Sequence, residues 1–358
     1  MVDKLLGTMY NVRRFLWGIE GRCGMKKIKG RRWLFHIRKS KRGHSKKRPR
    51  SLLRHPRHTD RNTDTLSVPR GFSITRNYDE TIRFDNRLKS KILDLNGKDT
   101  LYIDFSNVEY VGMAALIYLL DLLDKVGTKN SGRVALIPPL EPKPMSRMQK
   151  SGLAGWIENV DELPEEWREG SSDVFPITVG TTVQNKEAGD ACQWIREKYP
   201  GLTERDTEPI YEMLVELMLN TFSHSGETEG ENKWYLYLEK IENEFHFIFL
   251  DAGIGIPKSV RKTLTEKIVV SDAFLLKSAF KGEYRTRTEE LHRGKGLPQI
   301  ANNLSLGSIR LGVVHSGKGC YKVDKRDSLD TGFNAKRMNK HLAGTLYHWI
   351  AVFKEGAQ

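Results

Sequence analysis

The order of apolar and polar residues in the first half of the chain predicts helices and strands in turn. Residues 77–95 carry apolar side chains at helical spacing, at positions 82, 84, 88, 92 and 95. Residues 100–126 start with the alternation of a strand and continue into a long apolar run, typical of a buried helix. A second strand is predicted at residues 133–139, and a short helix at 146–157. This order predicts a small α/β unit, residues 71–165, whose sheet is covered on one side.

The second half shows a similar mixture after a polar, turn-rich segment at residues 163–173, which we interpret as a linker. A second α/β unit is predicted over residues 175–358. Its helices are expected at 187–198, 206–224 and 296–304, and its strands at 233–240, 245–250 and 344–353. The runs SIRLGVV and GCYKVD, on either side of HSGK, predict a hairpin. The pattern is weaker across residues 258–293, and no internal repeat is visible in the sequence.

The composition fits a globular chain of two domains and an extension. The sequence has 358 residues, of which 38% are hydrophobic and 29% are charged. A run of about 18 apolar residues is missing, so no membrane-spanning helix is expected, and the N-terminus does not resemble a secretory signal. Cys23, Cys192 and Cys320 are far apart and outside any CxxC motif. We therefore expect no disulfide framework or zinc site, and a cytoplasmic protein.

Positive charge is concentrated at the start of the chain. Residues 1–60 contain 19 Lys and Arg against 3 Asp and Glu, which leaves 40 basic and 42 acidic residues in the remainder. The body is nearly neutral and gives no general reason to bind nucleic acid. Residues 1–70 also show no sustained hydrophobic period, so we interpret them as a basic, disordered arm.

The role of this arm remains open. A basic block stays extended until an anionic partner collects it, and that partner could be RNA, DNA or an anionic membrane surface. A disordered tail without a partner fits the pattern equally, as does a start codon placed upstream of the real protein. An organellar transit peptide is a further alternative, because the arm is rich in Arg and poor in acids.

Three polar residues recur at a spacing of four on the predicted helix 206–224. They are Glu216, Asn220 and His224, in the stretch ELMLNTFSHS. Residues at i, i+4 and i+8 lie in one stripe of a helix, and the apolar residues Leu214, Leu217, Met218 and Phe222 can cover the other side. A solvated helix face would give the same row, as would a histidine that caps the last carbonyls.

Two glycine-containing turns follow this row. FHFIFLDAGIGIP places Asp251 at the end of a hydrophobic strand, with Gly253 and Gly255 after it. Such a turn lets a planar ring approach the backbone, and the carboxylate can accept a hydrogen bond from an exocyclic amine. HRGKGLPQI places Gly294 and Gly296 at a helix start, where backbone N–H groups and the lysine between the glycines suit phosphate oxygens.

The ordered set of E-x-x-x-N on a helix, D-x-G-x-G after a strand, and G-x-G-L opening a helix resembles the GHKL ATPase superfamily. That superfamily includes gyrase, a class of heat-shock chaperones, histidine kinases and mismatch-repair ATPases. The resemblance covers about residues 180–355 and implies a Bergerat-type α/β sandwich, with a mixed sheet and helices on one face, that binds ATP and Mg²⁺. A Walker-type site is not expected, because the sequence has no GxxxxGK[ST].

The resemblance also implies roles for individual residues. Asn220 would bind the Mg²⁺ that bridges the phosphates, and Glu216, one turn earlier, would be the catalytic residue that activates water. Asp251 would read adenine, with Gly253 and Gly255 beside it. The other residues implied to bind the nucleotide are His224, Arg293, Gly294, Lys295, Gly296, Leu297 and, after Gly344 on the last strand, Thr345.

The weakly patterned segment, residues 258–293, would then form a lid over ATP. Its basic residues and those just after it are candidates to meet the triphosphate: Arg285, Arg287, Arg293 and Lys295. A solvated basic loop would explain the first two as well.

LYIDFSNVEYVGMAALIYLL, in the first unit, resembles the strand, loop and helix of a STAS domain of the anti-anti-sigma type. Those domains carry D-S-x-G at the loop, with the serine as phosphate acceptor. Gly112 and Met113 stand in the places of the Asp and Ser, so we expect no phosphoserine switch there, and nothing marks the nearby Ser106 as an acceptor. The resemblance implies a STAS-like scaffold that contacts a partner protein.

Three functions remain open at this stage. The chain could be an ATP-hydrolysing switch that acts on a protein partner through the STAS-like unit. It could be a serine protein kinase of the anti-sigma type, with Glu216 as base toward a hydroxyl. It could also be a nucleic-acid-associated regulator that uses the basic arm and ATP as a signal. A two-component histidine kinase fits less well, because the region before residue 180 reads as α/β rather than as a helical hairpin.

Overall fold

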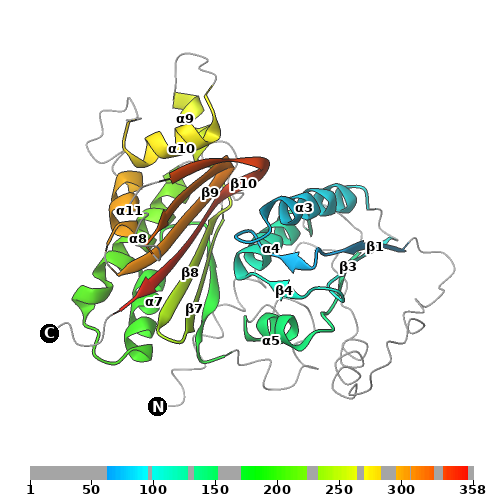
Figure 1. Cartoon of the computed structure of the whole chain (residues 1–358), viewed down its shortest axis with the longest axis horizontal. Coiled ribbons are helices and arrows are strands. Elements are labelled where there is room, and N and C mark those ends of the chain that lie inside the picture. Colours follow the sequence, from blue (N-terminus) through cyan, green and yellow to red (C-terminus); the bar gives the residue numbers. More distant parts are fainter. Residues whose placement is uncertain are drawn as a thin grey trace.

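The computed structural model describes residues 63–95, 99–127, 133–151, 171–223, 233–263, 270–283, 296–306, 308–325 and 334–353. The chain is mixed α/β and has two units that lie side by side (Figure 1). We call residues 63–151 the N-terminal unit and residues 171–353 the C-terminal unit. None of the described helices is both long and apolar enough to cross a membrane.

The N-terminal unit is built on a parallel sheet in the order β1-β3-β5. Its elements are β1 Thr63–Ser67, β2 Gly71–Phe72, α3 Tyr78–Leu93, β3 Thr100–Asp104, β4 Tyr110–Val111, α4 Met113–Gly127, β5 Arg133–Ile137 and α5 Pro142–Lys150. The predicted α/β order is confirmed, although the last helix starts four residues earlier than expected. The predicted end of the arm at residue 70 was too late, because β1 already pairs with β3.

The C-terminal unit is built on a five-stranded sheet in the order β6-β7-β8-β10-β9. Its strands are β6 Val174–Gly180, β7 Trp234–Ile241, β8 Glu244–Asp251, β9 Ile309–Asp324 and β10 Asn334–Val352. Its helices are α7 Asn185–Lys198, α8 Glu204–Ser223, α9 Ile256–Thr263, α10 Asp272–Phe280 and α11 Gly296–Leu304. Every neighbouring pair of these described strands is antiparallel, so the expectation of a mixed sheet was wrong for this part of the chain.

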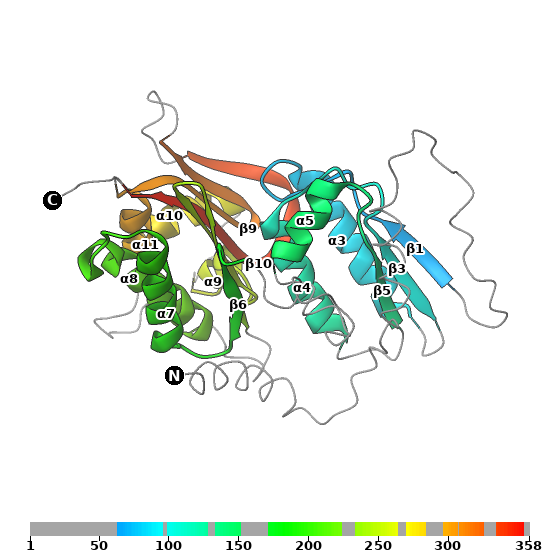
Figure 2. The same ribbon diagram turned by 90° about the horizontal axis from the view of Figure 1, so that it is seen from below.

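Both faces of the five-stranded sheet are buried, because apolar residues occupy both alternating sets of β7 and β8. Leu236 and Phe247 pack with the helices of the C-terminal unit, whereas Tyr235, Tyr237 and Ile248 pack with α3 and α4. Figure 2 shows α7, α8 and α11 on one side of the sheet and the N-terminal unit on the other. A strand with both faces covered reads as a continuous apolar run, as WYLYL does here.

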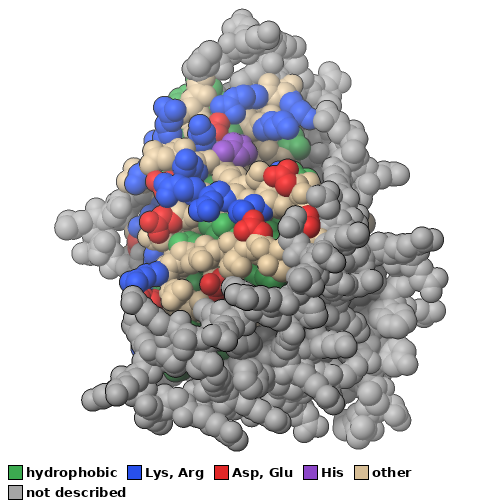
Figure 3. All heavy atoms as spheres, turned by 90° about the vertical axis from the view of Figure 1, so that its right-hand side faces the viewer, with side chains coloured by type: hydrophobic (Ala, Val, Ile, Leu, Met, Phe, Trp, Pro, Cys, Tyr) green, Lys and Arg blue, Asp and Glu red, His purple; other side chains and the backbone are tan. Residues whose placement is uncertain are grey.

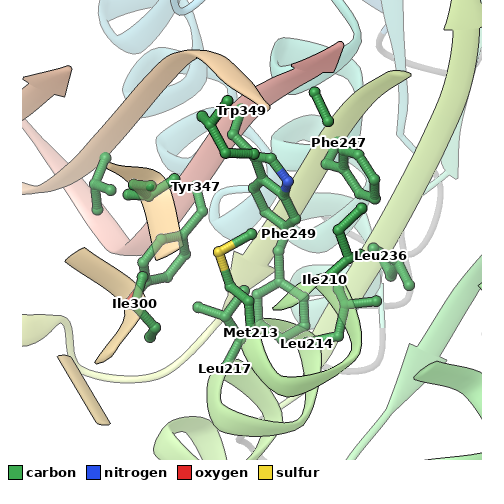
Figure 4. Close-up of a cluster of buried hydrophobic side chains, with 14 of the residues drawn as sticks. Ile210, Met213, Leu214, Leu217, Leu236, Phe247, Phe249, Ile300, Tyr347 and Trp349 are labelled. Atoms are coloured by element: carbon green, nitrogen blue, oxygen red, sulfur yellow. The ribbon is translucent and has the colours of Figure 1, made fainter. Parts of the chain in front are cut away.

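Helix α8 contributes its apolar stripe to the core of the C-terminal unit. Leu214, Leu217 and Met218 are buried, as expected from the sequence. Leu214 and Leu217 lie together with Tyr347 and other core side chains in Figure 4. Phe222 was also expected to cover this side but is 51% exposed. The apolar stripe of α8 therefore ends one turn before the helix does.

The hairpin predicted around HSGK is wrong. Strand β9 runs through these residues without a break, and its hairpin partner is β10. Gly317 has a φ of +59° and Gly344 a φ of +79°, and both lie where the β9–β10 register shifts. The glycines of this region therefore serve a bulge between two long strands rather than a turn.

The segment expected to be a lid is partly regular structure. Helices α9 and α10 lie within residues 258–293, and the buried Leu275, Leu276 and Phe280 of α10 pack into the core. The side chain of Asp272 accepts a hydrogen bond from Lys318 N at 2.6 Å and pairs with Arg261 at 2.5 Å. Residues 258–263 and 270–283 are thus part of the folded body, and the rest of the predicted lid, residues 264–269 and 284–293, lies outside the described residues.

Basic side chains are exposed on one face of the described part of the chain. Arg83 and Arg87 on α3 and Lys336 and Arg337 on β10 are exposed. Tyr78 and Lys340 bring these two elements together, because the tyrosine hydroxyl donates to the lysine carbonyl at 3.0 Å. Figure 3 shows Lys and Arg side chains gathered in the upper part of this side of the molecule.

Candidate functional site

The two described residues of the polar row on α8, Glu216 and Asn220, are half-buried rather than fully solvated. Leu217 and Met218 between them are buried in the core, and Leu219 is exposed. The Nδ2 atom of Asn220 is buried and has no hydrogen-bond partner among the described residues. An orphaned buried amide is unusual and needs an explanation, such as a ligand that completes its bonding.

Glu216 lies directly against Gly296, the first residue of α11. A Cβ on Gly296 would overlap the Glu216 carboxylate, so a larger residue there would have to displace the carboxylate from this position. Burial raises the pKa of Glu216 above its ordinary value. The row on α8 and the start of α11, which are 80 residues apart in the sequence, are therefore in contact at this glutamate.

Asp251 ends β8 between Trp234 on β7 and Thr345 on β10. Its side chain accepts a hydrogen bond from Gly253 N at 2.9 Å. Burial raises the pKa of Asp251 to about 6, against the opposite effects of the Gly253 amide, Lys125 and the Thr221 hydroxyl. Thr221 follows Asn220 on α8, so this part of the helix lies close to the Asp251 carboxylate.

The glycines predicted to surround the nucleotide are tied together by Ser316 on β9. The Ser316 hydroxyl accepts from Ile256 N at 2.9 Å and donates to Gly344 O at 3.1 Å. It also forms a hydrogen bond of 3.0 Å with the Thr345 hydroxyl. Gly255, with a φ of +85°, packs so tightly that an added Cβ would lie 2.9 Å from Gly344 O.

The two halves of the candidate site meet at Tyr347 on β10. Burial raises the pKa of this tyrosine well above its usual range, and the carboxylates of Asp251 and Glu216 both add to that effect. Tyr347 is 3% exposed and belongs to the core shared with α8. Asp251 follows Phe249 by two residues on β8 and therefore lies on the sheet face that packs against α8, the helix that carries Glu216. Figure 4 shows Tyr347 in this core.

The residues fit a magnesium ion that is held mainly by a phosphate ligand. No group of three or more His, Cys, Asp or Glu side chains that could hold a metal occurs in the described part of the chain. Mg²⁺ in nucleotide sites usually keeps several waters and takes one or two protein ligands together with the phosphates. The half-buried Asn220 could supply such a ligand through its amide oxygen, and its unpaired Nδ2 would then be left to donate a hydrogen bond to a phosphate oxygen.

Several predicted site residues cannot be placed. His224, Arg285, Arg287, Arg293, Gly294 and Lys295 lie outside the described residues. Leu297 is partly buried against the core and contributes packing at the start of α11. The structure therefore brings Glu216 against Gly296, and Asp251 and Gly255 against Gly344, with Thr345 beside Asp251.

Sequence reasoning missed three residues of this region: Thr221, Ser316 and Tyr347. Ser316 lay in the segment HSGK, which the glycine content made look like a turn. Thr221 lies beside Asn220 in the motif, and its hydroxyl next to a predicted ligand residue could have marked it as a candidate site residue. Tyr347 is one position of a continuous apolar strand, and no sequence feature marks it out.

The loop of the N-terminal unit shows no accessible acceptor hydroxyl at the position expected from the STAS resemblance. Met113 is buried, and a Cβ on Gly112 would lie 2.9 Å from the hydroxyl of Ser73, which is itself buried. Ser106 is buried too and accepts a hydrogen bond from Asn107 Nδ2 at 3.3 Å. None of these three positions therefore presents an exposed hydroxyl.

Comparison of the chain with protein-family models gave no match, and comparison with curated proteins gave no significant match. Function must therefore be inferred from the geometry and chemistry of the site.

Proposed function

We propose that the C-terminal unit is an ATPase unit of the GHKL type, which binds ATP with Mg²⁺ and hydrolyses it. We further propose that the N-terminal, STAS-like unit passes the nucleotide state to a partner protein. One observation carries the proposal, namely that the fold brings distant segments together at Tyr347. Glu216 contacts Gly296, and Asp251 contacts Gly344 and pairs with Thr345. Both carboxylates act on the pKa of Tyr347.

Each residue has a distinct task in this proposal. The ionised Asp251 carboxylate accepts a hydrogen bond from the exocyclic amine of adenine, and Gly253 and Gly255 let the base approach the backbone. Glu216 accepts a proton from the attacking water, a task that suits a carboxylate whose pKa is raised by burial. Asn220 would hold Mg²⁺, and the bound ion would neutralise charge on the phosphates.

The test measures binding and turnover separately in the full-length chain. Glu216→Gln is expected to bind ATP like the wild type, whereas phosphate release falls by about 10²–10⁴-fold because the base is lost. Asn220→Ala is expected to lose the magnesium dependence of ATP binding. Titration calorimetry with and without Mg²⁺, and a phosphate-release assay, give both quantities.

Glu212→Gln is the matched control, because Glu212 lies one turn earlier on the same helix and is exposed. It removes the same charge and should leave both measurements unchanged. Wild-type protein that binds no ATP would refute the proposal.

A serine kinase would use the same residues, so the fate of the γ-phosphate decides between the two activities. Radiolabel that appears on a protein instead of as free phosphate would favour the kinase. The N-terminal unit is a poor substrate for such a reaction in its own chain, because Met113 stands in the acceptor position and is buried.

A further inference from the structure

Helix α4 of the N-terminal unit contacts the end of β8, next to Asp251, on the sheet face opposite α8. Lys125 Nζ donates to the carbonyl of Ala252, the residue after Asp251, at 2.9 Å. Ala252 is 6% exposed and packs in the core shared by the two units. Lys125 also pairs with Asp121 on its own helix at 2.9 Å, which orients the ammonium group toward the strand.

A second contact from α4 reaches the bulge on β10. Ala343 N donates to the Tyr118 hydroxyl at 3.0 Å. Ala343 lies between the pairs Leu342–Gly317 and Thr345–Ser316, where the β9–β10 register shifts. The Tyr118 hydroxyl thus accepts a hydrogen bond from a backbone amide that lies where the β9–β10 ladder is interrupted, one residue before Gly344.

A third contact secures the strand on the other side of Asp251. Asp124 of α4 pairs with Lys233, at the start of β7, and accepts a hydrogen bond from the Tyr235 hydroxyl at 3.0 Å. The Lys233 carbonyl in turn accepts from Ala252 N at 2.9 Å. Three residues of one helix, Tyr118, Asp124 and Lys125, therefore contact all three strands at the base-binding end of the site.

We propose that Lys125 and Tyr118 are positioning residues of the nucleotide site, through which α4 sets the affinity of the C-terminal unit for ATP. This inference rests on the proposed function. Neither side chain needs to touch the nucleotide, because each holds the backbone next to a residue that does. Lys125 holds the turn after Asp251, and Tyr118 holds the bulge before Gly344 and Thr345.

The same contacts make the N-terminal unit a regulator of the site. A partner that shifts α4 changes the affinity for ATP, and ATP changes the affinity for that partner by the same factor. The coupling needs no contact between partner and nucleotide. It needs only that α4 keeps its two hydrogen bonds in one state and loses them in the other.

The test compares Lys125→Met with Lys91→Met in the full-length chain. The two lysines are similarly exposed, at 36% and 34%, and each is ion-paired, but Lys91 pairs with Asp64 away from the C-terminal unit. Lys125→Met is expected to bind ATP roughly tenfold more weakly, as loss of one charge-assisted hydrogen bond implies. Lys125→Arg should restore most of the affinity, and Lys91→Met should bind like the wild type.

Base selectivity separates a positioning role from a general loss of folding. Misfolding lowers the fraction of active protein but leaves the ratio of ATP to GTP affinity unchanged, whereas a displaced Asp251 turn lowers that ratio. Tyr118→Phe, which removes a single hydroxyl, gives a second measurement should Lys125→Met fold poorly, and the same fall in ratio is expected. Unchanged affinity and ratio in both variants would overturn the inference while the proposed function stands. Wild-type protein without ATP binding would overturn both.

Discussion

The Glu216 carboxylate lies so close to Gly296 that any side chain at position 296 would have to displace it. The carboxylate of Glu216 occupies the space in which a Cβ would stand. Gly296→Ala should therefore displace the carboxylate, and we expect ATP turnover to fall by about 10²-fold, since small misplacements of catalytic groups have effects of this size. Overpacking should also lower the free energy of unfolding by about 1–3 kcal/mol.

Gly189→Ala is the control for this substitution. Gly189 lies inside α7, and nothing approaches its Cβ position within 4 Å. Alanine there should raise the free energy of unfolding by about 0.5–1 kcal/mol through helix propensity, and leave turnover unchanged. Phosphate release and denaturant unfolding measure both effects. Equal turnover in the two alanine variants would show that the contact with Gly296 does not position the Glu216 carboxylate for catalysis.

The raised pKa of Asp251 predicts a pH dependence of base binding. The carboxylate must be ionised to accept a hydrogen bond from the adenine amine, and its pKa is about 6. Adenosine, which carries no phosphate, should therefore bind about tenfold more tightly at pH 7 than at pH 5, with the change centred near pH 6. Calorimetric titration at several pH values measures this, and Asp251→Asn should bind weakly without the pH dependence.

The raised pKa of Asp251 also makes the free energy of unfolding depend on pH. A carboxylate whose pKa is raised by folding binds its proton more tightly in the folded state. Between pH values of about 4 and 6 the unfolded chain loses the proton of this carboxylate while the folded chain keeps it, so the free energy of unfolding of the nucleotide-free protein should fall as the pH rises. Saturating adenosine should reduce that loss, because it binds the ionised form.

Ser316 connects the turn after Asp251 with the bulge at Gly344 and Thr345, and we expect its loss to affect both. Ser316→Ala removes hydrogen bonds to Ile256, Gly344 and Thr345 and leaves a buried backbone amide without its acceptor. We expect the free energy of unfolding to fall by about 1–3 kcal/mol and ATP binding to weaken, as measured by chemical denaturation and calorimetry. Ser90→Ala, at an exposed position of α3, is the control. If Ser316→Ala kept full affinity, the turns would be held by packing alone.

Local pattern predicted most elements because their hydrophobic periods are strong. Helix α8 and strands β7 and β8 were placed to within a few residues, and the row of Glu216 and Asn220 was recognised before its neighbours were known. These features depend on side chains close together in the sequence. The spacing of apolar residues therefore contained the information.

The features that sequence missed depend on contacts between distant segments. The first half of β10, NAKRMNKHLA, is polar and shows no alternation, and it becomes a strand because β9 pairs with it. The role of Ser316 likewise follows from the register of β9 with β10. Packing of α4 behind Asp251 joins two units whose contact no short window of sequence can reveal.

Asp85 is a buried carboxylate in the core of the N-terminal unit, and both of its oxygens are without a hydrogen-bond partner among the described residues. Burial raises the pKa of Asp85 well above its ordinary value. Its protonated form is therefore favoured in the folded chain. Asp85 also affects nearby Tyr118. Burial raises the pKa of this tyrosine, and a negative charge on Asp85 adds to the rise.

Asp85→Asn should stabilise the protein at neutral and basic pH. The folded pKa lies above that of the unfolded chain, so the wild type has the full stability of this group below pH about 4 and loses it as the pH rises. Asparagine stays neutral, and we expect the variant to be more stable than the wild type by on the order of 1 kcal/mol at pH 8, with no advantage near pH 4. Thermal unfolding across this range measures the difference. Asp173→Asn, at an exposed carboxylate, should show no comparable trend, and a wild type that gains stability relative to Asp85→Asn as the pH rises would mean that Asp85 has a cationic partner in the folded protein.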